Sequence, residues 1–230
     1  MRAPVSVVIP TLDVAGRIGP CLARLMPGVS SGLVRELILA DGGSTDAIGE
    51  LAEAVGARLV RAPRGRGRQL AAGCAAARGD WLMVLHADTL LPAGWEETVR
   101  AHLADHPGQA GYFGLAFDAA GFGAAWVGAW ANLRAAVFAL PYGDQGLVLP
   151  VDLYRAAGGF PEVALMEDVA LVRRIGRRRL RRLPGRVVTS AARYQAEGWL
   201  RRGARNLVTL GLWTLGVPPE RLARWYRGRG

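Results

Sequence analysis

The chain has 230 residues, of which 51% are hydrophobic, and it carries a formal net charge of +10 without a single lysine. This length and composition exclude a disordered chain and fit one large α/β domain, or two small ones, with a real hydrophobic core. A phosphate-binding P-loop is also excluded, because its motif requires a lysine.

The two cysteines, Cys21 and Cys74, match no metal-ligand spacing. They predict a reducing compartment and no disulfide framework. The first ten residues contain too short an apolar run for a signal peptide and are typical of a first strand. We therefore expect a cytoplasmic protein.

Residues 173–186 concentrate the positive charge, with eight arginines and no acidic residue. Without these arginines the net charge of the chain would be only +2. Such a segment forms either a solvated helix-and-strand face or a surface that contacts anionic lipid or phosphate, which would hold the protein on the inner face of the membrane. Few aromatic residues interleave the arginines, so RNA binding is the weaker alternative and no nucleic-acid partner is expected.

The first half of the chain alternates short apolar runs with helical patterns. Strands are predicted over residues 5–9, 35–40, 57–62 and 80–87. Helices are predicted over residues 16–26, 44–56, 67–79 and 92–106, with Ser44 as an N-cap and with small residues in the third helix that let it lie close to a sheet. This alternation predicts an α/β fold with a mostly parallel central sheet and helices on both faces.

The second half is less regular. Residues 111–117 and 145–150 are typical of strands, and residues 121–140 form an apolar stretch as long as a membrane span. That stretch contains Asn132 and Arg134, which favours a packed or substrate-lining helix, with contact at a membrane interface as the alternative.

Polar residues follow each of the four predicted strands. They are Pro10, Thr11 and Asp13, then Asp41 and Ser44, then Arg64, Arg66 and Arg68, then His86 and Asp88. Each residue alone could be a turn or cap residue. Because the carboxyl ends of parallel strands meet at one edge of a sheet, we expect all four groups to lie together. Carboxylates mixed with arginines suit a nucleotide diphosphate held by a divalent metal and guanidinium groups.

Glu167 and Asp168 open another helix-like run. Acidic residues at a helix start often only interact favourably with the helix dipole, but the turn at residues 158–161 could place this pair in a cleft.

Gly65 and Gly67 resemble the start of a dinucleotide fingerprint. They follow the third strand and the third glycine is missing, so NAD binding is not expected.

With these motifs in order, the sequence resembles the inverting nucleotide-sugar glycosyltransferases of family two, which have the GT-A fold. The likeness rests on VSVVIPTLD, ELILADGGSTD, RGRQLAAGCAAARGDWLMVLHADT, GGFPE and MEDVAL. It extends over nearly the whole chain and is greatest to a short bacterial subgroup of uncertain acceptor. It implies one GT-A domain over residues 1–230, with a nucleotide-sugar-binding half in 1–106 and an acceptor-binding and catalytic half in 107–230.

On the donor side, the resemblance implies that the nucleotide is bound by Pro10, Thr11, Asp13, Asp41 and Arg68. His86 and Asp88 stand in the place of the family's Asp-x-Asp motif, which implies a Mn²⁺ or Mg²⁺ ion that bridges the donor phosphates. Imidazole at the first position favours Mn²⁺. Asp13 stands where the family usually has asparagine or tyrosine, so the base stays open: UDP is expected, with GDP as the alternative.

On the acceptor side, the resemblance implies that Asp168 is the catalytic base, with Glu167 beside it. Asp144 and Gln145 would face a hydroxyl acceptor. The implied reaction is a single in-line displacement with inversion at the anomeric carbon.

Two other functions fit parts of the sequence. A nucleotidyltransferase would share the sheet and the acidic site, but it would carry a basic, glycine-rich turn after the first strand, where PTLDVAG stands. A non-catalytic arginine-rich module that docks on membrane or RNA would need neither Asp88 nor Asp168.

Overall fold

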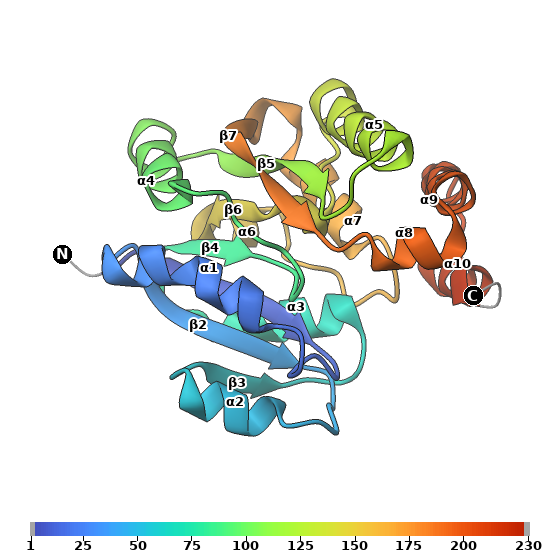
Figure 1. The fold of residues 1–230 in the computed structure, drawn as a ribbon. Coiled ribbons are helices and arrows are strands. Elements are labelled where there is room, and N and C mark those ends of the chain that lie inside the picture. The colour runs from blue at the N-terminus through green and yellow to red at the C-terminus, as the bar shows by residue number, and fades with distance from the viewer. Residues whose placement is uncertain (1–2, 228–230) are drawn as a thin grey trace.

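The computed structural model of the chain describes residues 3–227, and its centre is one seven-stranded sheet (Figure 1). The strands are β1 (Val5–Thr11), β2 (Val34–Asp41), β3 (Arg58–Arg61), β4 (Trp81–Val84), β5 (Ala110–Phe117), β6 (Leu147–Pro150) and β7 (Leu180–Thr189). They lie in the order β3-β2-β1-β4-β6-β5-β7. Only β6 runs antiparallel to its neighbours, so the prediction of a mostly parallel sheet is confirmed.

Helices cover both faces of this sheet. They are α1 (Gly19–Ser30), α2 (Ile48–Ala54), α3 (Arg66–Ala76), α4 (Trp95–Asp105), α5 (Phe122–Phe138), α6 (Val151–Ala156), α7 (Glu167–Ile175), α8 (Ala192–Glu197), α9 (Trp199–Thr214) and α10 (Pro219–Arg227), with the 3₁₀ turns η1 (Gly143–Gln145) and η2 (Arg177–Arg179). Side chains of a strand alternate between faces, and Val7 packs into the core under α1, α2 and α4, whereas Val8 packs into the core under α3, α6 and α7. The predicted two-sided packing is therefore confirmed.

Helix α3 lies close against the sheet, as its small residues predict. A Cβ on Gly73 would come within 2.6 Å of Val8 Cγ1, so any larger residue would push the helix away. This close packing fixes the start of α3, with Arg66, at the carboxyl ends of the strands.

Two local predictions need correction. Strand β4 ends at Val84 and not at residue 87, so His86 lies in the loop beyond the strand, together with Asp88. Helix α2 begins at Ile48 with Ala47 as its N-cap, and Ser44 caps nothing, because its hydroxyl donates instead to Asp41.

Helix α5 is a packed helix. Asn132 accepts a hydrogen bond from the Leu115 N–H of β5 and donates to the Leu115 carbonyl, which fastens α5 over the sheet. Throughout residues 3–227, no helix is both long and apolar enough to cross a membrane.

The antiparallel strand β6 completes the functional edge of the sheet. Leu147 pairs with Val84, the last residue of β4. Because the two strands run in opposite directions, the residues just before Leu147 lie beside the residues just after Val84. The η1 turn therefore reaches the same edge as His86 and Asp88.

Candidate active site

The loops after β1 and β2 are tied to each other. Asp13 has a left-handed backbone, with φ of 50°, and its Oδ1 accepts hydrogen bonds from the N–H of Thr45 at 2.8 Å and from its hydroxyl at 3.2 Å. The Asp13 N–H in turn donates to Ser44 Oγ at 2.9 Å. Asp13 thus shapes the predicted nucleotide pocket, and direct contact with a nucleotide stays a prediction.

Asp41 lies buried at the base of these loops. Its carboxylate accepts hydrogen bonds from the Ser44 hydroxyl and from the N–H groups of Gly43 and Ser44, with a longer one of 3.3 Å from Thr11. Burial alone would raise the pKa of Asp41, but these hydrogen bonds outweigh it and hold the pKa below its ordinary value. The site thus keeps a charged, preorganised carboxylate below the loops that follow β1 and β2.

Gln69 is a structural residue that the sequence reading did not single out. Its buried amide donates to the carbonyl of Thr11, the last residue of β1, at 2.6 Å and to that of Ala40, the next-to-last residue of β2, at 2.9 Å. It holds the two strand ends at a fixed spacing. In the sequence, only its position one helical turn after Arg66 indicates that Gln69 could lie near the site.

Arg66 occupies the middle of the site. Its Nε lies 3.0 Å from Glu167 Oε1, and its Nη2 lies 3.3 Å from His86 Nδ1. One guanidinium therefore links the start of α3, the loop after β4 and the start of α7. Arg68, which the resemblance places near the diphosphate, points outward to Glu162 at 3.9 Å, so contact between Arg68 and a diphosphate stays a prediction.

His86 is held as a neutral imidazole. Burial, followed by the nearby cations Arg66 and Arg193, keeps the pKa of His86 well below its usual range. Because a guanidinium can only donate, Nδ1 accepts from Arg66 and Nε2 carries the proton, and Nε2 is buried with no partner among the described residues. Neither nitrogen offers a free lone pair in this arrangement, so metal ligation by His86 stays a prediction that requires Arg66 to move.

The η1 turn and α7 place the predicted base. The Gly143 N–H donates to Asp168 Oδ2 at 2.7 Å, and the Val169 N–H donates to Asp168 Oδ1 at 2.7 Å. The residue before the pair, Met166, has a left-handed backbone with φ of 66°, which turns the chain sharply into α7. Such strain is concentrated at functional sites.

Glu167 is buried, whereas Asp168 is half-exposed. Burial raises the pKa of Glu167 to about 7, an effect that Arg66 opposes and the neighbouring Asp168 increases. Of the two acids, Asp168 is the more accessible and Glu167 pairs with Arg66, and their roles toward an acceptor stay predictions.

Asp144 and Asp88 bring two more carboxylates to this edge. Burial raises the pKa of Asp144 to about 6, Arg134 opposes this rise, and Asp168 and Asp88 add to it. Asp144 Oδ1 is buried and lacks a hydrogen-bond partner in the described part of the chain. Asp88 is exposed. Within residues 3–227, no three His, Cys, Asp or Glu side chains form a preassembled metal site.

A small cavity of about 60 Å³ lies between α5 and α9, and of the acids at this edge Asp144 lines it. Its polar walls include Asp144, Tyr142 and Arg134, and its apolar walls include Trp130 and Leu207. Gln145 does not line it, because its side chain is fully buried and bonds to the Phe113 carbonyl and the Tyr142 N–H. Acceptor contact by Gln145 stays a prediction, and the geometry favours Asp144.

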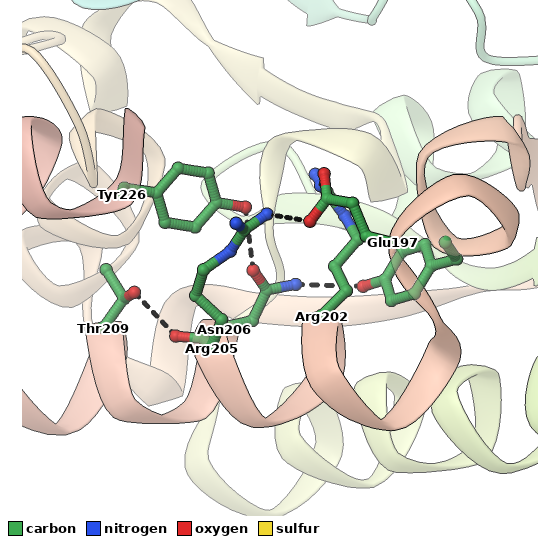
Figure 2. Close-up of polar contacts among 7 residues, drawn as sticks. Glu197, Arg202, Arg205, Asn206, Thr209 and Tyr226 are labelled. Carbon is green, nitrogen blue, oxygen red and sulfur yellow. Dashed lines mark hydrogen bonds and ion pairs between the residues drawn. The ribbon is translucent and has the colours of Figure 1, made fainter. Parts of the chain in front are cut away.

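The outer wall of this cavity is held by a polar network among α8, α9 and α10 (Figure 2). Glu197 pairs with both Arg202 and Arg205. Asn206 donates to the Tyr194 hydroxyl at 2.9 Å and accepts from the Tyr226 hydroxyl at 2.9 Å. Tyr194 and Asn206 both line the cavity, so the C-terminal helices form part of the candidate active site.

Known proteins resemble this chain in sequence and in fold. The model of the family described as glycosyl transferase family 2 matches residues 6–126. Glucosyl-3-phosphoglycerate synthase of Mycolicibacterium paratuberculosis (strain ATCC BAA-968 / K-10) is 38% identical over 97 residues, which cover 38% of this chain and 29% of that protein. The match thus extends over less than a third of the length of that relative.

Solved structures share the fold. Glucosyl-3-phosphoglycerate synthase of Mycobacterium tuberculosis, in complex with Mn²⁺, UDP and glucosyl-3-phosphoglycerate, has a TM-score of 0.61 and 21% identity over 94% of this chain and 81% of that one. S. aureus TarS residues 1–349 have a TM-score of 0.64 and 14% identity over 95% of this chain and 68% of that one. The predicted GT-A fold is confirmed.

Proposed function

Since the chain belongs to glycosyl transferase family 2 and is a glycosyltransferase, we propose that it transfers a sugar from a UDP-sugar to a hydroxyl acceptor, with inversion and with a divalent metal. The observation that carries this proposal is the convergence of Asp88, Asp144 and Asp168 with Arg66 at one edge of the sheet. Donor binding is assigned to residues 1–106 and acceptor binding with catalysis to residues 107–230.

The choice of UDP is supported by the relatives. The M. tuberculosis synthase has been solved with Mn²⁺ and UDP-glucose, and S. aureus TarS with UDP-GlcNAc. In this chain the nucleotide would lie over Pro10, Thr11, Asp13 and Asp41, where the ends of β1 and β2 form a rigid, hydrogen-bonded floor. The free thiols of Cys21 and Cys74 are consistent with the cytoplasm, where nucleotide sugars are available.

The residues of this edge fit a hard divalent cation. Mg²⁺ is commonly held by one or two carboxylates together with substrate phosphates rather than by a complete protein cage. The exposed carboxylate of Asp88 and the buried Oδ1 of Asp144, which has no hydrogen-bond partner among residues 3–227, support this mode. Asp88 would hold the metal, which when bound would neutralise the donor phosphates.

The protein's own groups supply the remaining chemistry. Asp168 is held by two backbone N–H groups. It accepts the proton of the acceptor hydroxyl while the hydroxyl oxygen attacks the anomeric carbon of the donor sugar. The nucleotide diphosphate leaves from the opposite face, so the configuration inverts. Arg66 and Arg193 face the site as cations and stabilise the charge that develops on the leaving group.

A thermal-shift screen tests this proposal. A ligand that binds only the folded state raises the melting temperature by mass action. We expect UDP-sugars to raise it in the presence of Mn²⁺ and to lose this effect when the metal is chelated. If no UDP-, GDP- or dTDP-sugar raises the melting temperature with or without Mn²⁺, the proposed function is wrong.

A further inference from the structure

Exposed apolar side chains gather on one part of the surface. Thirteen large hydrophobic side chains are exposed among the described residues, and ten of them belong to α5, α9 or the residue that ends α9. These ten are Phe122, Trp126, Trp130, Leu133, Val137, Phe138, Leu200, Leu207, Val208 and Leu215, and we call them the α5/α9 surface. Single exposed apolar residues are ordinary, but a cluster of this kind marks an interaction site.

Helix α5 is apolar on two sides, and the sheet covers only one of them. Ala124, Ala131 and Ala135 are buried on the inner side, whereas Phe122 is 81% and Trp126 is 59% exposed. The exposed side chains at 122, 126, 130, 133 and 137 recur at the spacing of a single helical stripe. The stripe therefore needs a partner that the described chain does not provide.

The apolar faces of α5 and α9 are continuous. A Cβ on Gly203 of α9 would lie 3.8 Å from Val127 Cγ2 of α5, so the two helices touch. Trp130 of α5 and Leu207 of α9 both belong to the exposed set, and both line the cavity that contains Asp144. The apolar surface thus reaches the mouth of the acceptor side of the active site.

The two helices of this surface carry no negative charge, and the nearest acids along the chain, Asp118 and Glu197, precede α5 and α9. Neither α5 nor α9 contains an aspartate or glutamate. Arg182 and Arg186 are exposed on β7. A Cβ on Gly114 of β5 would lie 3.0 Å from Arg182 Nη2, 3.0 Å from Arg186 Cγ and 3.3 Å from Asn132 Oδ1. Both arginines therefore lie close to Asn132 of α5. Figure 1 shows α5 on the same side of the fold as β5, the strand next to β7.

From these observations we infer that the α5/α9 surface docks on an anionic lipid bilayer. Aromatic and aliphatic side chains that enter the interfacial region, bordered by arginines that attract anionic headgroups, are the two components of peripheral membrane binding. A second copy of the chain fits less well, because a net charge of +10 on each copy and an arginine border would repel. This part of the inference rests on the proposed function. Docking through the α5/α9 surface would place the cavity that contains Asp144 next to the bilayer, so the acceptor would be a hydroxyl compound carried in the membrane.

Co-flotation with vesicles tests the inference. The full chain should bind vesicles of phosphatidylcholine mixed with phosphatidylglycerol, should bind phosphatidylcholine alone far less, and should dissociate at high salt. The double variant Phe122→Ser/Trp126→Ser should bind about tenfold more weakly or worse, because one buried aromatic side chain is worth at least that factor. The double variant Arg182→Glu/Arg186→Glu should lose the preference for anionic vesicles.

Matched controls come from α1 and β2, near the opposite end of the sheet from β5 and β7. Met26→Ser/Val29→Ser removes two exposed apolar residues from α1, and Arg24→Glu/Arg35→Glu reverses two exposed charges, so both should bind as the wild type does. The inference is overturned if the wild type does not bind, if it binds neutral and anionic vesicles equally, or if the controls lose as much binding as the surface variants. A dimer in light scattering that Phe122→Ser/Trp126→Ser converts to a monomer would assign the surface to a second copy instead.

The same samples separate this inference from the proposed function. The thermal shift given by UDP and Mn²⁺ should be unchanged in all four double variants, which also shows that they fold. If that shift is present but vesicles are not bound, only the docking inference is wrong. If vesicles are bound but no nucleotide sugar gives a shift, the proposed function is wrong and the docking surface stands.

Discussion

The Gly143 N–H donates to Asp168 Oδ2 at 2.7 Å, which ties the turn before β6 to the first turn of α7. The bond joins two segments that are 25 residues apart in the sequence. It depends on the antiparallel direction of β6, which returns the chain to the edge where the parallel strands end. The carboxylate is thereby oriented before any substrate arrives.

Replacing Gly143 with alanine should disturb this arrangement. A Cβ there would lie 2.8 Å from Arg66 Nη2 and 2.8 Å from His86 Nε2, so these two side chains, which surround Asp168, would have to shift. A displacement of about 1 Å near the reacting groups can cost on the order of 10²-fold in rate. We expect a loss of that order in the rate of UDP release from a UDP-sugar. Gly108→Ala, where a Cβ meets nothing within 4 Å, should retain the wild-type rate, and equal rates for the two variants would contradict the assigned geometry.

Asp88→Asn should remove the metal-dependent part of donor affinity. We expect UDP to bind at least about tenfold more weakly in the presence of Mn²⁺, because even second-shell changes cost that much at metal sites. Binding without metal should not change. Calorimetric titration of UDP measures both, with Asp105→Asn on the exposed face of α4 as the control. Unchanged affinity with Mn²⁺ in Asp88→Asn would show that the metal assignment is wrong.

Glu167 predicts a pH dependence of stability. Burial raises its pKa from 4.5 to about 7 in the folded protein, so the native state holds a proton that the unfolded chain releases. This stabilisation is complete below pH 4.5 and is lost as the pH rises through about 7. Chemical denaturation across this range should show the wild type losing unfolding free energy relative to Glu167→Gln. The exposed control Glu162→Gln should follow the wild type, and parallel curves for wild type and Glu167→Gln would refute the shift.

The first half of the fold could be predicted because β1, β4 and the second half of β2 are apolar runs that are buried on both faces. Strand β7 could not, because five of its ten residues, Arg181, Arg182, Pro184, Gly185 and Arg186, are exposed and its pairing with β5 shifts register between Tyr112 and Gly114. An edge strand of this kind lacks both the apolar run and the alternation that identify strands from sequence.

The polar loops were predicted as a group, but their internal partners were not. The sequence favours Arg68 as easily as Arg66, and only the close packing of α3 decides that Arg66 faces His86 and Glu167. Ser44 looks like an N-cap, yet the buried Asp41 takes its hydroxyl. Arg134 and Tyr194 reach the cavity through contacts of α5 and α8 that no local pattern encodes.

The most direct test of the proposed mechanism is the rate of UDP release by Asp168→Asn, measured together with its UDP affinity in Mn²⁺. Asparagine keeps the size of the side chain and can still accept the Gly143 N–H, but it cannot take up the acceptor proton. We predict a rate about 10²–10⁴-fold below that of the wild type, which is the usual cost of losing a general base, with UDP affinity unchanged. Near wild-type turnover in Asp168→Asn would contradict the account, and if Glu167→Gln were inactive in the same assay, the base would be Glu167.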